Sequence, residues 1–183
     1  LKQLNNVKEL HVVAVNNGVK ELLWILQGGF VNDVLVKTVN LKKGLKETYD
    51  FIWSEEKRTS LTFTKPQHFL YEPNAAILKA GAFKLITKDF KVKKLNLHSH
   101  LYTSMELIEF PGRSFKIENV IDYNKKELKK LRNTKANITI RNFPENVANI
   151  RKRFNIKEVG DDYLFFTTLN KNELLILAEL IKP

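Results

Sequence analysis

The feature that most constrains the fold is an alternation of strand-like and helix-like segments in the last third of the sequence. Strands are predicted where apolar and polar residues alternate, at Ser114–Ile121, Ala136–Ile140 and Tyr163–Thr168. Helices are predicted from Asn124 to Arg132, from Pro144 through Phe154, and over Lys171–Ile181. Asn124 precedes Glu127, and Asn170 precedes Glu173, at capping-box spacing. This order predicts helices packed on a small sheet.

The first 112 residues contain similar segments in a less regular order. Strands are predicted at Glu9–Val15, Asp33–Leu41, Ser60–Thr64 and Lys94–Leu101, and helices at Val19–Gln27 and after Pro73. Lys42–Lys57 is polar and receives no assignment. Pro111-Gly112 is a turn signal, and we place a domain boundary there. No apolar run approaches the roughly 18 residues of a membrane span, so no membrane partner is expected.

Several kinds of site lack their usual residues. The sequence has no cysteine, which excludes disulfides and thiolate metal sites. Its seven glycines form no G-x-G-x-x-G motif, no P-loop and no methyltransferase glycine loop, so no cofactor site is expected in this chain. A G-x-S-x-G nucleophile motif is also absent. Leu1 begins the sequence in the middle of a pattern, which suggests a piece of a longer protein, most simply a cytoplasmic one.

Two histidines and two carboxylate pairs are weak candidates for chemistry. His98 and His100 would share one face of a strand and, with His68 or Glu72, could bind a metal ion. Together with Glu72, the two histidines could instead form the active site of a hydrolase. Two partly exposed polar residues explain the pattern as well, and we favour that interpretation because two ligands make a poor metal site. Structural roles are likewise expected for the pairs Glu55-Glu56 and Asp161-Asp162.

The positive charge of the chain is concentrated in one stretch. The net charge is +11, and residues 113–157 carry 13 Lys and Arg against 4 Asp and Glu, a net +9. Residues 1–112 have a net charge of +5, and residues 158–183 a net charge of −3. A concentrated excess of cations favours a polyanionic partner, nucleic acid first.

Ten cationic side chains of this stretch form the predicted basic cluster. They are Lys125, Lys126, Lys129, Lys130, Arg132, Lys135, Arg141, Arg151, Lys152 and Arg153. Leu128 and Leu131 are left to face the core. Such a cluster would neutralise phosphates and release counterions, but it would not read bases. The alternative is a solvated basic helix face without a ligand.

Several motifs occur together in an order that is known from one protein family. Three stretches carry the resemblance: Asn6–Ile25, Leu70–Leu85 and Lys135–Thr167. Within or between them lie the most specific motifs: Tyr71-Glu72-Pro73-Asn74 with Lys79-Ala80-Gly81, Ser99–Ser104 (SHLYTS), and Arg141-Asn142-Phe143-Pro144. The combination resembles the C-terminal part of bacterial class I S-adenosylmethionine-dependent methyltransferases that carry a ferredoxin-like segment and a THUMP-like domain.

The resemblance implies an α+β chain in three parts. Residues 1–45 would be the last strands and helix at the edge of the methyltransferase α/β sheet, residues 46–112 a ferredoxin-like segment, and residues 113–183 a small THUMP-like α/β domain. Relatives of that domain bind RNA, often tRNA. The family's cofactor and catalytic loops would lie upstream, so S-adenosylmethionine is expected in the full-length parent, and no catalytic residue is carried over.

The expected function follows from the resemblance and the charge. The chain would be the non-catalytic region of an RNA methyltransferase, which binds RNA and presents it to the upstream catalytic domain. Alone, it would not be active. The alternative is a module for protein–protein or self-association through a sheet edge at residues 9–41, and the sequence leaves the oligomeric state open.

Overall fold

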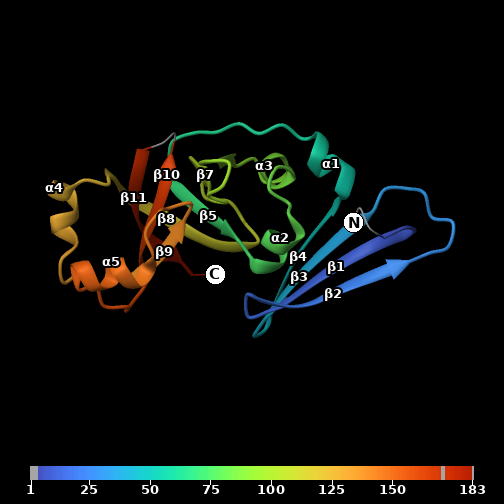
Figure 1. Cartoon of the computed structure of the whole chain (residues 1–183), viewed down its shortest axis with the longest axis horizontal. Helices are drawn as coiled ribbons and strands as arrows, with labels where there is room; N and C mark the ends of the chain where they lie inside the picture. The colour runs from blue at the N-terminus through green and yellow to red at the C-terminus, as the bar shows by residue number, and fades with distance from the viewer. Residues whose placement is uncertain (1–3, 170–171, 183) are drawn as a thin grey trace. The chain divides into compact units, whose positions relative to one another are not determined.

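The computed structural model describes residues 4–169 and 172–182, which form two units that interleave along the chain (Figure 1). Within the described residues, unit 1 takes in Leu1–Leu61, Pro73–Lys91 and Glu109–Gly112, and unit 2 takes in Thr62–Glu72, Val92–Ile108 and Arg113–Pro183. The chain therefore passes between the units several times.

Unit 1 is built on a four-stranded sheet with the strand order β2-β1-β3-β4. Only β1 and β3 run parallel, and the outer pairs are antiparallel. The elements are β1 (Val7–Val15), β2 (Gly18–Leu26), β3 (Leu35–Lys42), β4 (Leu45–Ile52), α1 (Trp53–Arg58), α2 (Ala75–Ala80) and α3 (Leu85–Asp89). Helix α2 packs on β1, β2 and β3, above the buried side chains of Val12, Ala14 and Val36.

The predicted helix Val19–Gln27 is wrong, because Gly18–Leu26 is strand β2. Asn16 and Asn17 adopt φ of 47° and 60°, the left-handed conformation that a tight β-hairpin turn needs and that Asn tolerates. The hairpin pairs Leu22 with Val12 and Trp24 with Leu10. Pairing with β1 therefore outweighs the helical spacing of the leucines, and residues 1–45 contain no helix among those described.

Two polar side chains accept hydrogen bonds from backbone N–H groups at the starts of helices α2 and α3 in unit 1. Asn74 caps α2 by accepting a hydrogen bond from the backbone N–H of Ile77 at 3.1 Å, which confirms the helix predicted after Pro73. Glu56 is buried and accepts hydrogen bonds from the backbone N–H groups of Phe83, Lys84 and Leu85 where α3 begins. Its structural role agrees with the sequence-based expectation.

Unit 2 is built on a seven-stranded sheet with the order β6-β7-β5-β8-β11-β10-β9. The strands are β5 (Phe69–Pro73), β6 (Lys93–Lys94), β7 (Tyr102–Ser104), β8 (Gly112–Asp122), β9 (Asn137–Arg141), β10 (Asp162–Leu169) and β11 (Asn172–Ile181). The helices are α4 (Lys125–Leu128), the 3-10 turn η1 (Lys129–Leu131) and α5 (Val147–Phe154).

Each face of this sheet carries its own hydrophobic core. On one face, Leu128 and Leu131 of the α4–η1 segment and Ile150 and Phe154 of α5 pack with Phe166. On the other face, the core joins two distant parts of the chain, with Leu70, Leu95 and Leu101 against Phe115 and Phe165. The segment around β5, β6 and β7, which forms one end of this sheet, therefore shares a core with β8 and β10.

The predicted helix Lys171–Ile181 is also wrong, because its described part is strand β11. β11 lies between β10 and β8 and pairs antiparallel with both. Ile176 and Ala178 face one core, and Leu175 faces the other. Because both faces of β11 are buried, its sequence is a continuous run of apolar residues and does not alternate. Asn170 and Lys171 lie outside the described residues, so the capping pattern at Asn170 is not tested.

The remaining predicted elements are mostly confirmed. β1, β3, β8, β9 and β10 match predicted strands, Asn124 caps α4, and α5 begins at Val147 with Asn146 as its cap. Ser60–Thr64 is not a strand and forms one bridge at Phe63. The predicted strand Lys94–Leu101 is wrong beyond Lys94, because the chain turns there.

None of the helices within residues 4–169 and 172–182 is long and apolar enough to cross a membrane.

Candidate nucleic-acid interface

The helical layer of unit 2 presents cations to solvent because its apolar side chains point the other way. Leu128 and Leu131 are buried as predicted, and so are Ile150 and Phe154 of α5. The α-helix ends at Leu128 and continues as a 3-10 turn, so Lys125, Lys129 and Arg132 do not follow the spacing of one continuous α-helix. All three side chains are nevertheless exposed.

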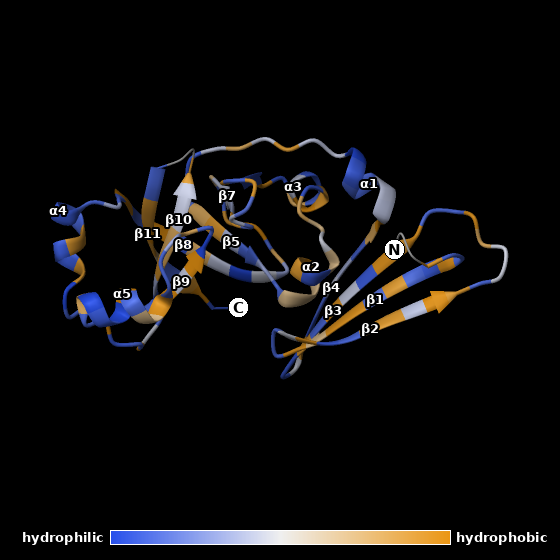
Figure 2. Cartoon of the chain, viewed as in Figure 1, coloured by the Kyte–Doolittle hydropathy of each residue, from blue (hydrophilic) through white to orange (hydrophobic). Residues whose placement is uncertain are grey.

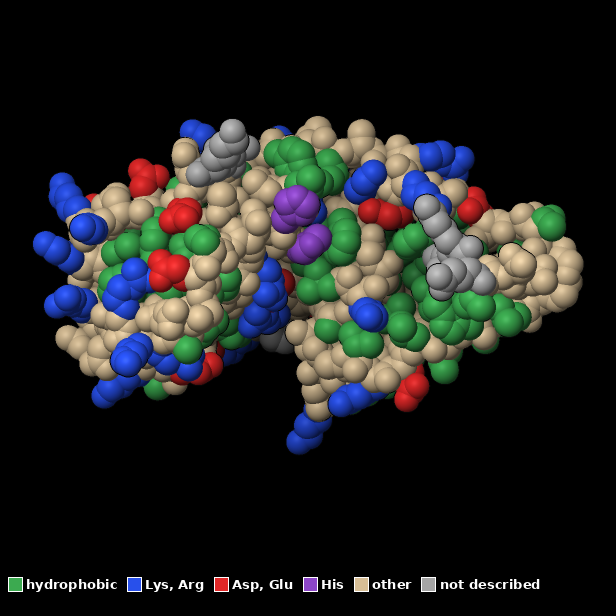
Figure 3. Space-filling view, in the orientation of Figure 1, with side chains coloured by type: hydrophobic (Ala, Val, Ile, Leu, Met, Phe, Trp, Pro, Cys, Tyr) green, Lys and Arg blue, Asp and Glu red, His purple; other side chains and the backbone are tan. Residues whose placement is uncertain are grey.

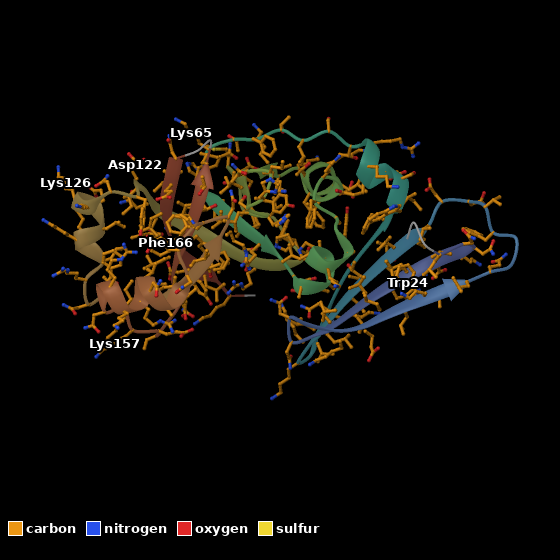
Figure 4. All side chains as sticks on the ribbon, viewed as in Figure 1. Trp24, Lys65, Asp122, Lys126, Lys157 and Phe166 are labelled. Carbon is orange, nitrogen blue, oxygen red and sulfur yellow. The ribbon has the colours of Figure 1, made fainter. Side chains whose placement is uncertain are left out.

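Seven exposed cations of this layer form no ion pair with any carboxylate in the described part of the chain. We call them the exposed basic surface: Lys125, Lys126, Lys129, Arg132, Lys135, Lys152 and Lys157. In Figure 3, blue side chains gather over α4 and α5. Figure 4 places Lys126 and Lys157 on the outer side of this layer and Phe166 inside it.

Lys157 belongs to this surface although the predicted cluster did not include it. A backbone bridge joins Lys135 to Lys157, and the N–H of Ala136 donates to the carbonyl of Lys157 at 2.9 Å. The bridge places two cationic side chains on neighbouring backbone segments. The sequence held a signal for Lys157 only in its charge, because the bridge depends on the fold.

Four residues of the predicted cluster have carboxylate partners instead. Lys130 pairs with Glu127 at 2.7 Å, and Arg151 with Glu158 at 2.7 Å. Arg153 pairs with Glu145 and also donates to the hydroxyl of Tyr123 at 3.0 Å. Arg141 binds the buried carboxylate of Glu72. These four charges are partly neutralised within the protein, which makes them weaker candidates for phosphate contact.

A cavity of about 330 Å³ opens beside the exposed basic surface. Its walls include the apolar side chains of Ile121, Leu131, Leu164 and Leu177, and Lys135 contributes to its lining. Three carboxylates, those of Glu118, Glu127 and Asp162, also line it. Lys130 lines the cavity as well, so three carboxylates face two lysines, and this charge balance disfavours phosphate.

A buried carboxylate joins the second sheet face to two guanidinium groups. Glu72 on β5 is 3% exposed, and its Oε2 accepts a hydrogen bond from Arg113 Nε at 2.9 Å. Arg141 donates to the other oxygen of Glu72. The Arg113 guanidinium also lies over the rings of Phe115 and Tyr163, 5.4 and 5.1 Å from their centroids. Glu72 therefore has the geometry of an ion-pair anchor.

His98 and His100 do not share a strand face. They lie in the turn after β6, where His98 is exposed and His100 is partly buried with φ of 51°. Burial, together with the charges of Lys94, Arg141 and His98, lowers the pKa of His100 to about 4. No group of three or more His, Asp or Glu side chains is placed to hold a metal ion within residues 4–169 and 172–182.

The hydrolase alternative receives no support from this arrangement. Glu72 would have to act as a base or nucleophile, but both of its oxygens accept hydrogen bonds from arginine side chains. The carboxylate of Glu72 therefore acts as an ion-pair partner in this structure. His68, a possible third ligand in the metal-site alternative, has its Nδ1 3.2 Å from the carbonyl oxygen of Met105.

The glycines of the chain do not form a loop that fits S-adenosylmethionine. Gly28 and Gly29 connect two strands, Gly44 lies in the turn between β3 and β4, and Gly81 ends helix α2. Gly18 and Gly112 begin strands, and Gly160 precedes β10. None of them lies between the end of a strand and the start of a helix, where a phosphate or cofactor loop would be formed.

Two family matches cover most of the chain beyond β4. Residues 69–111 match a ferredoxin-like domain, and residues 112–180 match a THUMP domain-like family. The chain carries a ferredoxin-like domain followed by a THUMP-like domain. Leu70, Leu95 and Leu101 of the first match share a core with Phe115 and Phe165 of the second, whereas residues 73–91 of the first match belong to unit 1.

A solved structure supports the same relation over nearly the whole chain. The crystal structure of a "putative methyltransferase" from Porphyromonas gingivalis W83 is 34% identical, with a TM-score of 0.91. The match covers 99% of this chain and 47% of that protein, so the chain spans about half the length of this relative. No curated protein matches the chain. The resemblance to methyltransferases that carry a ferredoxin-like segment and a THUMP-like domain is thereby confirmed.

Proposed function

We propose that the chain is the RNA-binding region of an S-adenosylmethionine-dependent RNA methyltransferase and presents the RNA to the catalytic part of that enzyme. One observation carries the proposal: the THUMP-like domain exposes seven cations that have no ion-pair partner in the described part of the chain. THUMP domains generally bind RNA, which agrees with a phosphate-binding role for this surface.

The physical argument rests on what each cation gains from a phosphate. An exposed lysine that already pairs with a carboxylate must give up that partner before it binds phosphate. The lysines of the exposed basic surface carry no such cost, because no carboxylate of the described chain pairs with them. Each phosphate they neutralise releases condensed counterions, so binding is favoured most strongly at low salt.

Fluorescence polarisation with labelled tRNA tests this function. We expect the variant Lys125→Glu/Lys129→Glu/Lys152→Glu to bind at least tenfold more weakly than the wild type at low salt, because three attractive charges become repulsive. The matched control is Lys43→Glu/Lys46→Glu/Lys79→Glu, which makes the same charge change at exposed positions of unit 1. Equal losses in the two variants would show that only net charge matters and would refute a defined interface.

A second candidate function rests on a different observation, in unit 1. β2 is an edge strand of its sheet, and five consecutive apolar side chains on it are exposed: Leu22, Leu23, Trp24, Ile25 and Leu26. In Figure 2, the arrowhead end of β2 has the orange colour of hydrophobic residues. An apolar edge strand with open backbone hydrogen-bonding groups favours pairing with another segment.

We propose that β2 docks against the half of the methyltransferase that corresponds to the unmatched part of the P. gingivalis protein. Because a Trp53→Phe variant leaves Trp24 as its only tryptophan, its fluorescence reports directly on β2. Adding that unmatched half, prepared separately, should shift the Trp24 emission to shorter wavelength in a saturable way. No shift, or the same shift on concentrating the chain alone, would reject this partner, and the latter would indicate self-association.

A further inference from the structure

The cavity beside the exposed basic surface is lined by the α4–η1 segment and by the sheet of unit 2, and all of its lining residues belong to that unit. The sheet contributes the apolar side chains of Ile121, Leu164 and Leu177, and η1 contributes Leu131. Its volume of about 330 Å³ is at the lower end of the range for pockets that hold small molecules. The cavity is therefore limited to a small ligand, such as a single nucleoside.

A β-bulge in β8 turns a polar side chain toward the cavity. In the pairing with β11, Ile117 lies opposite Ala178. Asn119 lies opposite Leu177, so Glu118 is an extra residue between them. Ile117 packs against the core on one face of the sheet, and Leu177 packs against the core on the other. Residues two apart in a regular strand share a face, so the bulge is what places Asn119 on the face of the cavity.

Asp162 supplies a carboxylate on the same face, at the start of β10. It lies two residues before Leu164, which packs in the core beneath the α4–η1 segment, so the two side chains share a face. The other two carboxylates of the lining, those of Glu118 and Glu127, each pair with a lysine, at 3.0 and 2.7 Å. Asp162 pairs with no lysine or arginine among the described residues, so both of its oxygens are acceptors for a ligand.

Two donors of the lining complement this carboxylate. The side-chain oxygen of Asn119 accepts a hydrogen bond from the backbone N–H of Val120 at 2.9 Å, so its NH₂ group is the part that can donate to a ligand. Lys135 also lines the cavity, and it belongs to the exposed basic surface. A ligand in the cavity would therefore lie next to the cations that are proposed to bind phosphate.

We propose that the cavity binds a guanine base of the bound RNA. Guanine presents two neighbouring donors, N1–H and the 2-amino group, which match the two oxygens of Asp162, and its O6 accepts from Asn119 or Lys135. Adenine, cytosine and uracil lack this pair of donors. The uncharged base also agrees with the apolar walls and with a charge balance that disfavours phosphate. The assignment to RNA rests on the proposed function, whereas binding of guanine as such depends only on the cavity.

Guanosine and inosine make the test direct, because inosine lacks only the 2-amino group. Neither nucleoside carries phosphate, so the exposed basic surface does not contribute to their binding. The backbone amide signals of the whole chain are followed by NMR during titration with each nucleoside. We expect saturable shifts at Ile121, Leu164 and Leu177 and about tenfold tighter binding of guanosine, since inosine loses one hydrogen bond to a charged group. Equal affinities, or shifts that leave out the cavity, would overturn the proposal.

Three variants locate the ligand in the cavity. Asp162→Asn should bind guanosine about tenfold more weakly and lose the preference over inosine, because Asn has one side-chain oxygen. The matched control is Asp161→Asn, which makes the same charge change at a neighbour that does not line the cavity, and its affinity should be unchanged. Asn119→Phe should exclude both nucleosides by filling space. Wild-type affinity for guanosine in Asp162→Asn, or in Asn119→Phe, would overturn the site.

A last arm decides whether the guanine belongs to RNA. Fluorescence polarisation compares a labelled oligouridylate with the same oligomer carrying one central guanosine. The wild type should prefer the second oligomer about tenfold, and Asp162→Asn should lose this preference and keep its affinity for oligouridylate. Equal affinity of the wild type for the two oligomers would reject RNA as the source of the base. If neither oligomer binds, the proposed function fails, and the nucleoside titration still decides whether the cavity binds guanine.

Discussion

Removing the charge of Glu72 should destabilise unit 2 more than the loss of any exposed ion pair. The carboxylate is 3% exposed and holds Arg113 and Arg141, whose side chains are 31% and 36% exposed. Glu72→Gln keeps the shape of the side chain but turns an acceptor-only group into one whose NH₂ faces guanidinium donors. The two arginines would then repel one another across an uncharged neighbour.

The size of the effect follows from the burial of the three groups. Removing one partner of a fully buried ion pair costs about 3–5 kcal/mol of unfolding free energy. Because the arginines are about one-third exposed, water replaces part of the lost interaction, and we expect a loss of about 2–3 kcal/mol. For a chain of this size, such a loss corresponds to a fall in melting temperature of roughly 5–10 °C.

Far-UV circular dichroism during thermal and urea unfolding measures this loss. Both tryptophans, Trp24 and Trp53, lie in unit 1, so tryptophan fluorescence in the same samples reports the unfolding of that unit separately. The matched control is Glu158→Gln, which breaks an exposed pair with Arg151 and should cost less than about 0.5 kcal/mol. A Glu72→Gln variant as stable as that control would refute the anchoring role of Glu72.

Three further predictions concern the fold and its dependence on pH. His100 has a pKa of about 4 in the folded chain and 6.5 ordinarily, so the unfolded chain binds this proton first as the pH falls. Stability should therefore decrease between about pH 6.5 and pH 4, and His100→Asn should remove that part of the decrease in urea midpoint; an identical pH profile in the variant would contradict this. Asn16→Ala should destabilise the β1–β2 hairpin by about 1 kcal/mol and Asn16→Gly should not, as judged by urea unfolding, because φ is 47° there. Leu175→Ala should cost about 2–5 kcal/mol in the same assay, since Leu175 is fully buried on β11; a loss below about 1 kcal/mol would argue against a central position for that strand.

The sequence predicted elements well where local signals and tertiary pairing agree. Asn124 and the helix after Pro73 are examples, because a capping side chain acts within its own helix turn. It failed at β2 and β11, where leucine-rich segments with good helix formers are strands. Pairing with distant strands decides both, although Asn16-Asn17-Gly18 between two apolar runs is a hairpin signal that the sequence did contain.

The candidate site was predictable only in its charge. A local excess of lysine and arginine indicates a basic region, but it does not show which cations have partners. Glu145 and Glu158 lie within eight residues of the arginines they bind, whereas Glu72 and Arg141 are 69 residues apart. Separating the exposed basic surface from the internally paired cations therefore required the fold, and so did the addition of Lys157.

The salt dependence of RNA binding tests the central claim most directly. The dissociation constant for labelled tRNA is measured by fluorescence polarisation over a series of salt concentrations, for the wild type, for Lys125→Gln/Lys129→Gln/Lys152→Gln, and for the control Lys43→Gln/Lys46→Gln/Lys79→Gln. Each phosphate contact contributes about 0.7–0.9 to the slope of log affinity against log salt. Loss of three contacts should therefore lower the slope by about 2–3 in the first variant and leave it unchanged in the control. Equal slopes in all three proteins would contradict the claim that this surface binds RNA.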